Sequence, residues 1–246
     1  MIKILELSVP HMKQITKLFL ALFLSLASLN ASEQLILIVS NNFDTDKAVL
    51  TRYEYIQDQY LKVSETVTVN IGRHGLGWGI GQAGFKPKAD EPIKHEGDGK
   101  APAGIFKISK AFGYAKSSNT KMPYIQADKT LICVDDSNSK DYNTILELNQ
   151  SDNPKSFEWM HRQDNLYRFG LVVEHNKIAK KGAGSCIFFH IRKSKDSPTA
   201  GCSAMKEEEL TRIIQWLDPK KEPIVVQIPR SYCSQAVKLF PGISCP

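Results

Sequence analysis

The chain has 246 residues, enough for one large domain or two small ones, and 42% of them are hydrophobic while 24% are charged. This composition is ordinary for a globular protein that buries a sizeable core. The net charge of +6 is spread along the chain, so the block of basic residues that would indicate a nucleic-acid partner is absent. We therefore expect no nucleic-acid partner.

The start of the chain has the features of a secretory signal peptide. Two lysines precede an uncharged run at residues 18–29, which is shorter than the ~20 apolar residues that span a bilayer. We predict a signal peptide over residues 1–31, cleaved after Ala27 or after Ala31, and an uncleaved membrane anchor is the alternative. In both cases the rest of the chain leaves the cytoplasm, and the membrane is contacted only through this segment.

Strand patterns dominate the rest of the chain. Short runs rich in β-branched, aromatic and aliphatic residues predict strands at residues 34–39, 50–55, 60–71, 105–109, 131–134, 168–174, 186–191 and 224–228. The glycine-rich stretch at residues 72–84 lacks the order of a phosphate-binding loop. The sequence thus predicts a mainly β fold with some α structure, as one domain over residues 34–230 and a tail over residues 231–246.

One segment is convincingly helical. Leu210, Ile213, Ile214 and Leu217 recur at the spacing of a single helix face. Three glutamates stand near its start, where the helix dipole favours negative charge, and Asp218-Pro219 ends it. We therefore predict a helix that follows Cys202.

The five cysteines leave at least one thiol unpaired in an oxidising compartment. Cys233 and Cys245 flank a short segment that can turn back on itself, so we expect them to form a disulfide. Cys133 and Cys186 lie in apolar, strand-like runs, where we expect buried and inert thiols. Cys202 stands apart because it follows a polar loop.

The segment C-I-F-F-H-I-R-K-S-K-D-S-P-T-A-G-C-S-A-M, at residues 186–205, combines the groups needed for thiol catalysis. A strand ends at His190, and a loop then returns the chain to Cys202 at the expected helix start. A helix N-terminus and a nearby imidazole lower the pKa of a thiol, so we predict Cys202 as nucleophile and His190 as its base. Backbone amides at Gly201 and Ser203 would hold the oxyanion, and the carbonyl of Ile191 or another nearby backbone oxygen would orient the imidazole.

Other readings of these residues remain open. His190 could be a satisfied histidine at a strand end, with Cys202 a small residue in a turn. A zinc site needs three or four ligands, and only two stand here, so we expect no metal and no cofactor. We interpret Glu96 and Asp98 as turn residues that cap backbone amides. The remaining histidines are interpreted as structural or solvated, and Trp78 as a stacking surface for a sugar or as core.

Four separated motifs in this order resemble the L,D-transpeptidase catalytic domain, which has the YkuD-like fold. They are E-G-D-G-K-A-P-A-G-I-F from residue 96, V-D-D-S-N-S-K-D-Y-N from residue 134, the approach G-x-G-S-x-I-F-x-H that ends at His190, and P-T-A-G-C-S-A-M around Cys202. The similarity covers roughly residues 34–229. The first of these motifs looks like that of the branch of the family that carries E-G-D-G-K-x-P-A-G.

The resemblance implies a β-sandwich and a periplasmic or secreted enzyme associated with the cell wall. Cys202 would attack the carbonyl of the L-centre in a peptidoglycan stem tetrapeptide, release D-Ala and form a thioester. An amine from a stem peptide, a D-amino acid or a protein would then take the acyl group. With water as acceptor, the same chemistry is L,D-carboxypeptidase trimming.

The chain departs from the commonest family motif at two positions. Ala200 replaces a histidine, and Ala204 stands where arginine is usual, whereas Thr199 and Gly201 fit the motif. Arg192 or Lys193 could substitute in holding the substrate carboxylate, and Thr199 and Trp78 are further candidates for substrate contact. The rival functions are a sortase-like transpeptidase, which wants an arginine beyond the cysteine, and a non-catalytic module that binds the cell wall.

Overall fold

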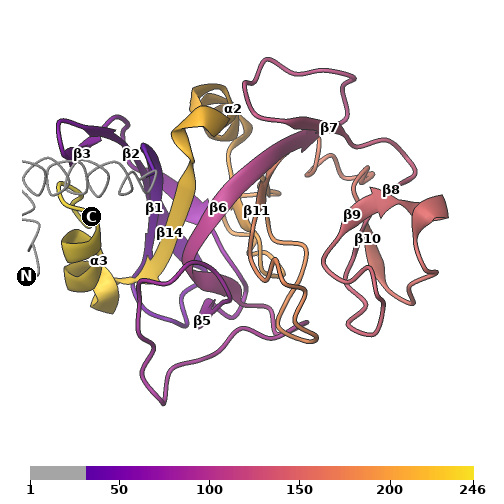
Figure 1. Cartoon of the computed structure of the whole chain (residues 1–246), viewed down its shortest axis with the longest axis horizontal. Helices are drawn as coiled ribbons and strands as arrows, with labels where there is room; N and C mark the ends of the chain where they lie inside the picture. The colour runs from indigo at the N-terminus through magenta and orange to yellow at the C-terminus, as the bar shows by residue number, and fades with distance from the viewer. Residues whose placement is uncertain (1–31) are drawn as a thin grey trace, which may run out of the picture. The chain divides into compact units, whose positions relative to one another are not determined.

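Apolar strands, several of them buried along their whole length, build the protein around one large sheet (Figure 1). The computed structural model describes residues 32–246, so the predicted signal peptide lies outside the described residues. Residues 32–246 form one compact unit. The expectation of a mainly β fold with few helices is confirmed.

The large sheet has eleven strands and closes on itself. Its main path runs β1-β14-β6-β11-β12-β13-β4-β2-β3, and an additional pairing of β1 with β2 completes a ring, while β5 and β7 pair with β6. Closure leaves fewer unpaired strand edges. The strands are β1 (Gln34–Ser40), β2 (Lys47–Ile56), β3 (Gln59–Lys62), β4 (Val67–Asn70), β5 (Leu76–Trp78), β6 (Ala101–Gly113), β7 (Tyr124–Gln126), β11 (Phe169–Val173), β12 (Phe188–Ile191), β13 (Ser203–Met205) and β14 (Ile224–Pro229).

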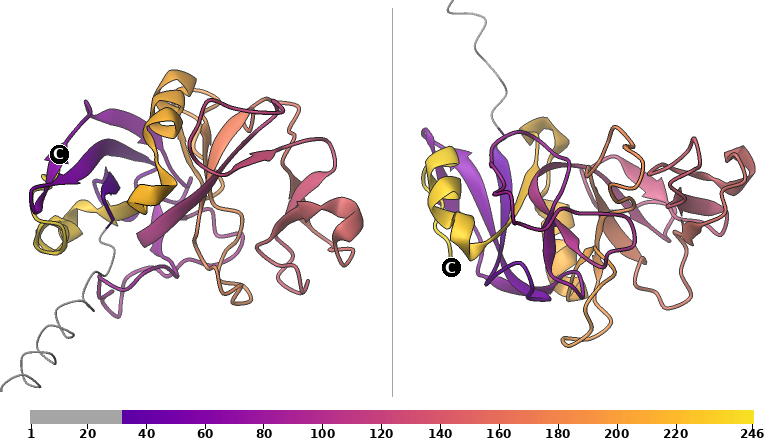
Figure 2. Two further views of the ribbon diagram at one scale, coloured as in Figure 1. Left: turned by 45° about the horizontal axis from the view of Figure 1, so that its top comes forward. Right: turned by 90° about the horizontal axis from the view of Figure 1, so that it is seen from below.

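A second sheet of three strands stands to one side of the large one (Figures 1 and 2). It has the order β10-β8-β9 and consists of β8 (Leu131–Val134), β9 (Ile145–Glu147) and β10 (Phe157–Trp159). The apolar side chains between the two sheets form a core of their own, separate from the core enclosed by the large sheet.

The predicted helix is present as α2 (Glu207–Trp216) and packs against β11 and β12. Leu210, Ile213 and Ile214 are buried, as their spacing predicts. A second helix, α3 (Cys233–Leu239), belongs to the C-terminal tail. The tail is packed on the main core, because Ala236 and Ile243 are both buried in it. No helix of residues 32–246 is long and apolar enough to cross a membrane.

The single strand expected at residues 60–71 is divided in two by the structure. Gln57 and Asp58 both have positive φ and form the tight turn of the β2–β3 hairpin. β4 then pairs with the first half of β2 in another register. β3 and β4 therefore pair with the same strand, and the register of that pairing shifts by two residues across the interruption at residues 63–66. The alternation of side chains along the sequence does not predict this shift.

Two disulfides tie the chain together, and one of them corrects the sequence analysis. Cys233 and Cys245 are bonded, as expected from their proximity. Cys133 and Cys186 were expected to be inert thiols, but they form a disulfide across 53 residues of sequence. This bond joins β8 of the small sheet to the segment that leads into β12, and only the packing of the two sheets brings the two cysteines together.

We predict that the Cys133–Cys186 bond contributes more stability than the Cys233–Cys245 bond. Chain entropy scales with the length of the closed loop, which gives about 4 kcal/mol for the 53-residue separation and about 3 kcal/mol for the 12-residue separation. Urea unfolding of C133S/C186S and of C233S/C245S measures both. A larger loss of unfolding free energy in C233S/C245S would contradict this ranking.

Candidate active site

The parallel pairing of β12 with β13 sets the positions of His190 and Cys202. His190 is in register with Ala204, and Phe189 is in register with Ser203. Paired residues face the same side of a sheet and successive residues alternate, so His190 and Cys202 lie on one face. The separation of the two cores agrees, because Phe188 and Cys202 belong to the smaller core between the sheets, whereas Phe189 and Met205 belong to the main core.

The sequence predicted that Cys202 lies at a helix N-terminus, and this prediction is wrong. β13 stands between the cysteine and α2, which begins at Glu207. The three residues Ser203–Met205 are too few to show a period in the sequence, and their strand form comes from pairing with β12. The N-terminus of α2 is therefore not adjacent to the thiol in the chain, and the first-turn amides of α2 are not the groups next to Cys202.

The Cys202 side chain is buried, with 7% of its surface exposed. Its Sγ accepts a hydrogen bond from the Phe188 N–H at 3.3 Å and donates to the Cys186 carbonyl at 3.6 Å. Burial raises the pKa of the thiol to about 12, and the negative charge of Glu158 adds to this. The expectation of a lowered pKa is therefore wrong for this state of the protein. Apolar neighbours pack around the sulfur and outweigh the nearby hydrogen-bond donors.

His190 is held as a neutral base. Its Nδ1 lies 2.8 Å from the Ile191 carbonyl oxygen, the orienting group that the sequence analysis named. A carbonyl only accepts, so Nδ1 carries the proton and Nε2 keeps a free lone pair. Burial lowers the pKa of the imidazole to about 4, and the positive charge of Arg162 acts in the same direction. At neutral pH His190 can accept a proton from a thiol.

Tyr167 and Glu158 complete the surroundings of the pair, and the sequence analysis missed both. The Tyr167 ring centroid lies 5.2 Å from that of His190, and its hydroxyl donates to Glu158 Oε2 at 2.6 Å. Burial raises the pKa of Tyr167, and the negative charge of Cys202 would raise it further. Burial also raises the pKa of Glu158. Glu158 lies in β10 and Tyr167 in the loop before β11, both far in sequence from the motif around Cys202. Sequence motifs therefore did not identify either residue.

The turn before Cys202 is closed by Thr199. The Thr199 hydroxyl donates to the Cys202 carbonyl at 2.6 Å and accepts from the Gly201 N–H at 3.1 Å. Thr199 was a candidate for substrate contact and the Gly201 amide for the oxyanion, but in this structure both groups are engaged with each other. The Lys100 carbonyl lies 3.0 Å from the place where a Cβ on Gly201 would stand, so only glycine fits without displacement.

The Ser203 side chain attaches its strand to the main core. It faces away from Cys202, and its hydroxyl donates to Gln227 Oε1 at 2.7 Å inside the main core. Gln227 in turn donates to the Pro102 carbonyl at 2.8 Å. This buried chain of hydrogen bonds connects β13 to β14 and β6, and the oxyanion role predicted for the Ser203 backbone amide stays a prediction.

Two further candidates for substrate contact lie away from the cysteine. Trp78 is buried in an aromatic cluster with Phe43, Phe85 and Tyr232, and its Nε1–H donates to Glu91. It presents no face to a sugar, and the core alternative applies. Arg192 lines a different hollow, of about 450 Å³, beside strands β2 and β4.

Glu96 and Asp98 play different parts. Asp98 accepts from the backbone N–H groups of His95 at 2.7 Å and Lys100 at 2.9 Å, which is the turn-capping role that was expected. Glu96 also accepts from a backbone N–H, that of Gly97 at 3.2 Å, as was expected, and in addition it accepts from the hydroxyls of Tyr142 and Ser185. It thus bridges the loop after β8 to the loop before β12, a tertiary contact that the turn interpretation did not include.

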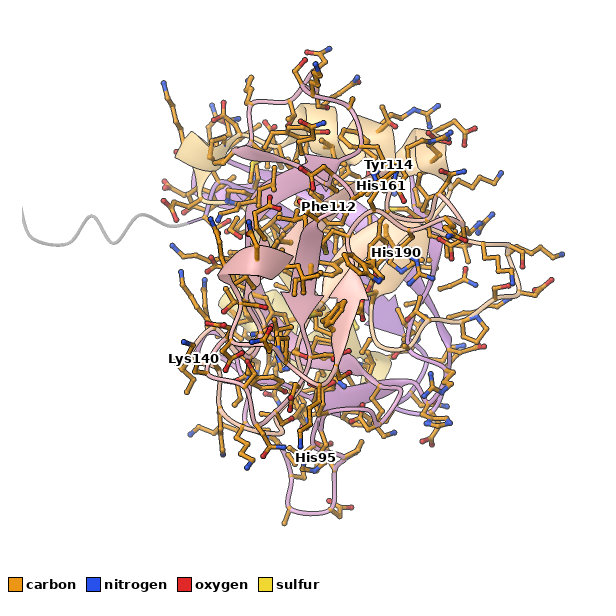
Figure 3. The ribbon with its side chains drawn as sticks, turned by 90° about the vertical axis from the view of Figure 1, so that its right-hand side faces the viewer. His95, Phe112, Tyr114, Lys140, His161 and His190 are labelled. Atoms are coloured by element: carbon orange, nitrogen blue, oxygen red, sulfur yellow. A yellow bond between two sulfur atoms is a disulfide. The ribbon has the colours of Figure 1, made fainter. Side chains whose placement is uncertain are left out.

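An open hollow of about 820 Å³ borders the small sheet and the loop that follows it. Figure 3 views this side, with His161 stacked on Tyr114 above His190. His161 also bonds the Ala127 carbonyl through Nδ1 at 2.8 Å. The hollow is lined by Lys129, Trp159, His161, Arg162, Gln163, Asp164 and Asn165. None of these residues was predicted from the sequence to contact substrate.

Within residues 32–246, no three His, Cys, Asp or Glu side chains gather in a way that could hold a metal ion. Comparison with known proteins found no family model, no curated protein and no solved structure that matches the chain.

We predict that the protein loses stability as the pH falls from about 6.5 to about 4. Burial lowers the pKa of both His190 and His175 to about 4. Between these pH values both histidines are protonated in the unfolded chain but neutral in the folded protein, so falling pH stabilises the unfolded state. Each histidine costs about 2 kcal/mol between pH 8 and pH 5. Urea unfolding at both pH values checks this, and H175Q should show a smaller pH dependence. An equal dependence in wild type and H175Q would contradict the assignment.

We predict that Cys202 reacts slowly with iodoacetamide in the folded protein. Burial raises the pKa of its thiol to about 12, whereas an unfolded thiol has a pKa near 8.5, so the thiolate fraction at pH 7.5 falls roughly a thousandfold. Labelling followed by mass spectrometry in buffer and in urea, with the disulfides intact, compares the two states. C202A controls for other sites, and similar rates in both states would refute the prediction.

Proposed function

We propose that the chain is a cell-wall L,D-transpeptidase that acts on stem tetrapeptides through a thioester on Cys202. The observation that carries the proposal is the free thiol of Cys202 on the same sheet face as the neutral, oriented imidazole of His190. The four ordered sequence motifs support the choice of family. The large closed sheet is, on this proposal, the family's YkuD-like catalytic fold.

The reaction uses His190 twice. Nε2 takes the thiol proton as Sγ attacks the carbonyl carbon of the L-centre, and an oxyanion forms. As it collapses, the carbon–nitrogen bond to D-Ala breaks, the imidazolium gives its proton to the leaving amine, and a thioester remains. An amine acceptor then loses a proton to Nε2 while it attacks the thioester, and the proton returns to the departing sulfur.

The two shifted pKa values disfavour a resting thiolate–imidazolium pair. The pKa of Cys202 is raised to about 12 and that of His190 is lowered to about 4, both by burial. The resting pair is therefore a neutral thiol and a neutral imidazole. General-base removal of the proton then accompanies attack on the carbonyl, in place of a preformed thiolate–imidazolium pair.

Export from the cytoplasm is part of the proposal. Four of the five cysteines are paired in two disulfides, and such bonds persist in oxidising compartments. This supports the periplasm or the cell exterior as the place of action, in agreement with the signal-peptide pattern. Peptidoglycan stem peptides are available there.

A second candidate is a non-catalytic module that binds the cell wall. The observation in its favour is the burial of the Cys202 side chain, of which 7% is exposed. A thiol enclosed by the small sheet reaches a carbonyl only if substrate displaces part of that cover. The two candidates differ in whether a covalent adduct forms.

We predict that wild-type protein incubated with a disaccharide tetrapeptide gains the mass of the acyl group and releases D-Ala, whereas C202A does neither. Intact-protein mass spectrometry detects the adduct, and chromatography of the small products detects D-Ala. An added D-amino acid separates the outcomes, since an exchanged tetrapeptide indicates transfer and a tripeptide indicates hydrolysis. Substrate binding with no adduct and no D-Ala release would refute the enzyme and favour the wall-binding module.

A further inference from the structure

Arg162 is a guanidinium held in a fixed position at the edge of the 820 Å³ hollow. Its Nε and Nη2 both bond Asp164, at 2.9 and 2.6 Å. Its Cζ lies 5.0 Å from the centroid of the Tyr167 ring, and the Tyr114 hydroxyl donates to its carbonyl at 2.7 Å. The guanidinium of Arg162 is thus oriented by Asp164 and Tyr167, and its backbone is held by Tyr114.

This orientation leaves donors free. A guanidinium has five N–H groups, and the contact with Asp164 uses two of them, so three remain for a ligand. The side chain of Arg162 is 37% exposed and can be reached from solvent. Across the hollow, the charged lining groups are Lys129 and Arg162 against Asp164, which leaves the positive sign in excess. The site is suited to a carboxylate.

The loop that carries Arg162 is attached to the strand that carries His190. The Ile191 N–H donates to the Leu166 carbonyl at 3.1 Å. The Tyr167 ring, which Arg162 covers, contacts the His190 ring at 5.2 Å between centroids. A single aromatic ring therefore separates the guanidinium from the candidate base.

The hollow also offers an apolar wall. Trp159 is 43% exposed, which is unusual for so large an apolar side chain, and it lines the hollow with His161. His161 is stacked on Tyr114, with ring centroids 3.9 Å apart. A peptide chain with a carboxylate end meets an oriented cation at one place and flat rings at another.

We propose that Arg162 binds the terminal carboxylate of the donor tetrapeptide and that the hollow holds the departing D-alanine end. The assignment rests on the proposed function, since it takes the scissile bond to be the one before that residue. Consecutive Cα atoms are about 3.8 Å apart, so the carboxylate of the last residue must lie near the attacked carbonyl. Asp164 is a positioning residue in this arrangement, and Arg192 has no part in it.

The test measures binding without turnover. C202A is titrated with a tetrapeptide that ends in D-Ala and with the same peptide ending in an amide, by calorimetry and by tryptophan fluorescence. In the C202A background, R162Q should weaken binding of the acid roughly tenfold to a hundredfold. Binding of the amide should change little. R162K keeps the positive charge but loses the planar guanidinium with its paired N–H donors. Its affinity for the acid should lie between those of C202A and of C202A/R162Q.

Matched variants make the result decisive. R212Q removes an exposed arginine that is paired with Glu209 on α2, and it should leave both affinities unchanged. R192Q tests the rival arginine and should also have no effect. Equal loss for acid and amide in R162Q, or loss in R192Q alone, would overturn the assignment. Failure of C202A to bind the acid more tightly than the amide would overturn it as well.

The two proposals can fail separately. If wild type forms the thioester adduct while R162Q leaves KM and acid binding unchanged, the proposed carboxylate site is wrong and the proposed enzymatic function is supported. If wild type forms no adduct but C202A binds the acid through Arg162, the proposed carboxylate site is supported and the proposed enzymatic function is wrong. When both hold, R162Q acting in otherwise wild-type protein should raise KM for the acid more than it lowers kcat.

Discussion

The candidate site depends on the parallel register between β12 and β13. With His190 opposite Ala204, the side chains of His190 and Cys202 share the face that looks toward the small sheet. A slip of one residue would turn one of them into the main core, because side chains alternate along a strand. The register is fixed from the core side by Phe189 and Met205, and by the hydrogen bond from Ser203 to Gln227. Packing of the core thus determines the chemistry on the opposite face.

The small sheet gives this face its electrostatic character. It encloses the Cys202 side chain together with Phe188 and Tyr167, and the Cys133–Cys186 disulfide attaches it to the segment that leads into β12. Exclusion of water disfavours the charged form of both groups, and therefore the pKa of the thiol rises while that of the imidazole falls. A neutral pair is the result, and its reactivity is tied to how a substrate displaces or penetrates the cover.

Tyr167 links the parts of the site that come from different segments. Its hydroxyl bonds Glu158 of β10, its ring touches His190 of β12, and Arg162 lies over its face. One buried aromatic side chain thereby connects a carboxylate, a base and a guanidinium. This arrangement places Arg162, which lines the hollow, on the Tyr167 ring that contacts the candidate base, although neither Arg162 nor Tyr167 belongs to a recognisable motif.

Local patterns in the sequence were enough for several elements. The spacing of Leu210, Ile213 and Ile214 identified α2, the apolar run at residues 131–134 matched β8, and the closeness of Cys233 and Cys245 indicated their bond. The orienting carbonyl of Ile191 was also foreseen, since it is next to His190 in the chain. Each of these depends on residues that are neighbours in sequence.

The sequence by itself therefore determined a mainly β chain with one amphipathic helix and identified His190 and Cys202 as candidates. Only the tertiary structure decided that Cys133 bonds Cys186, that β13 separates Cys202 from α2, and that Arg162 lies over the Tyr167 ring that contacts His190. The physical reason is that periodicity and turn chemistry act between near neighbours in the chain. Strand register, burial and the pKa shifts that follow from burial arise from segments that meet only when the two sheets pack together.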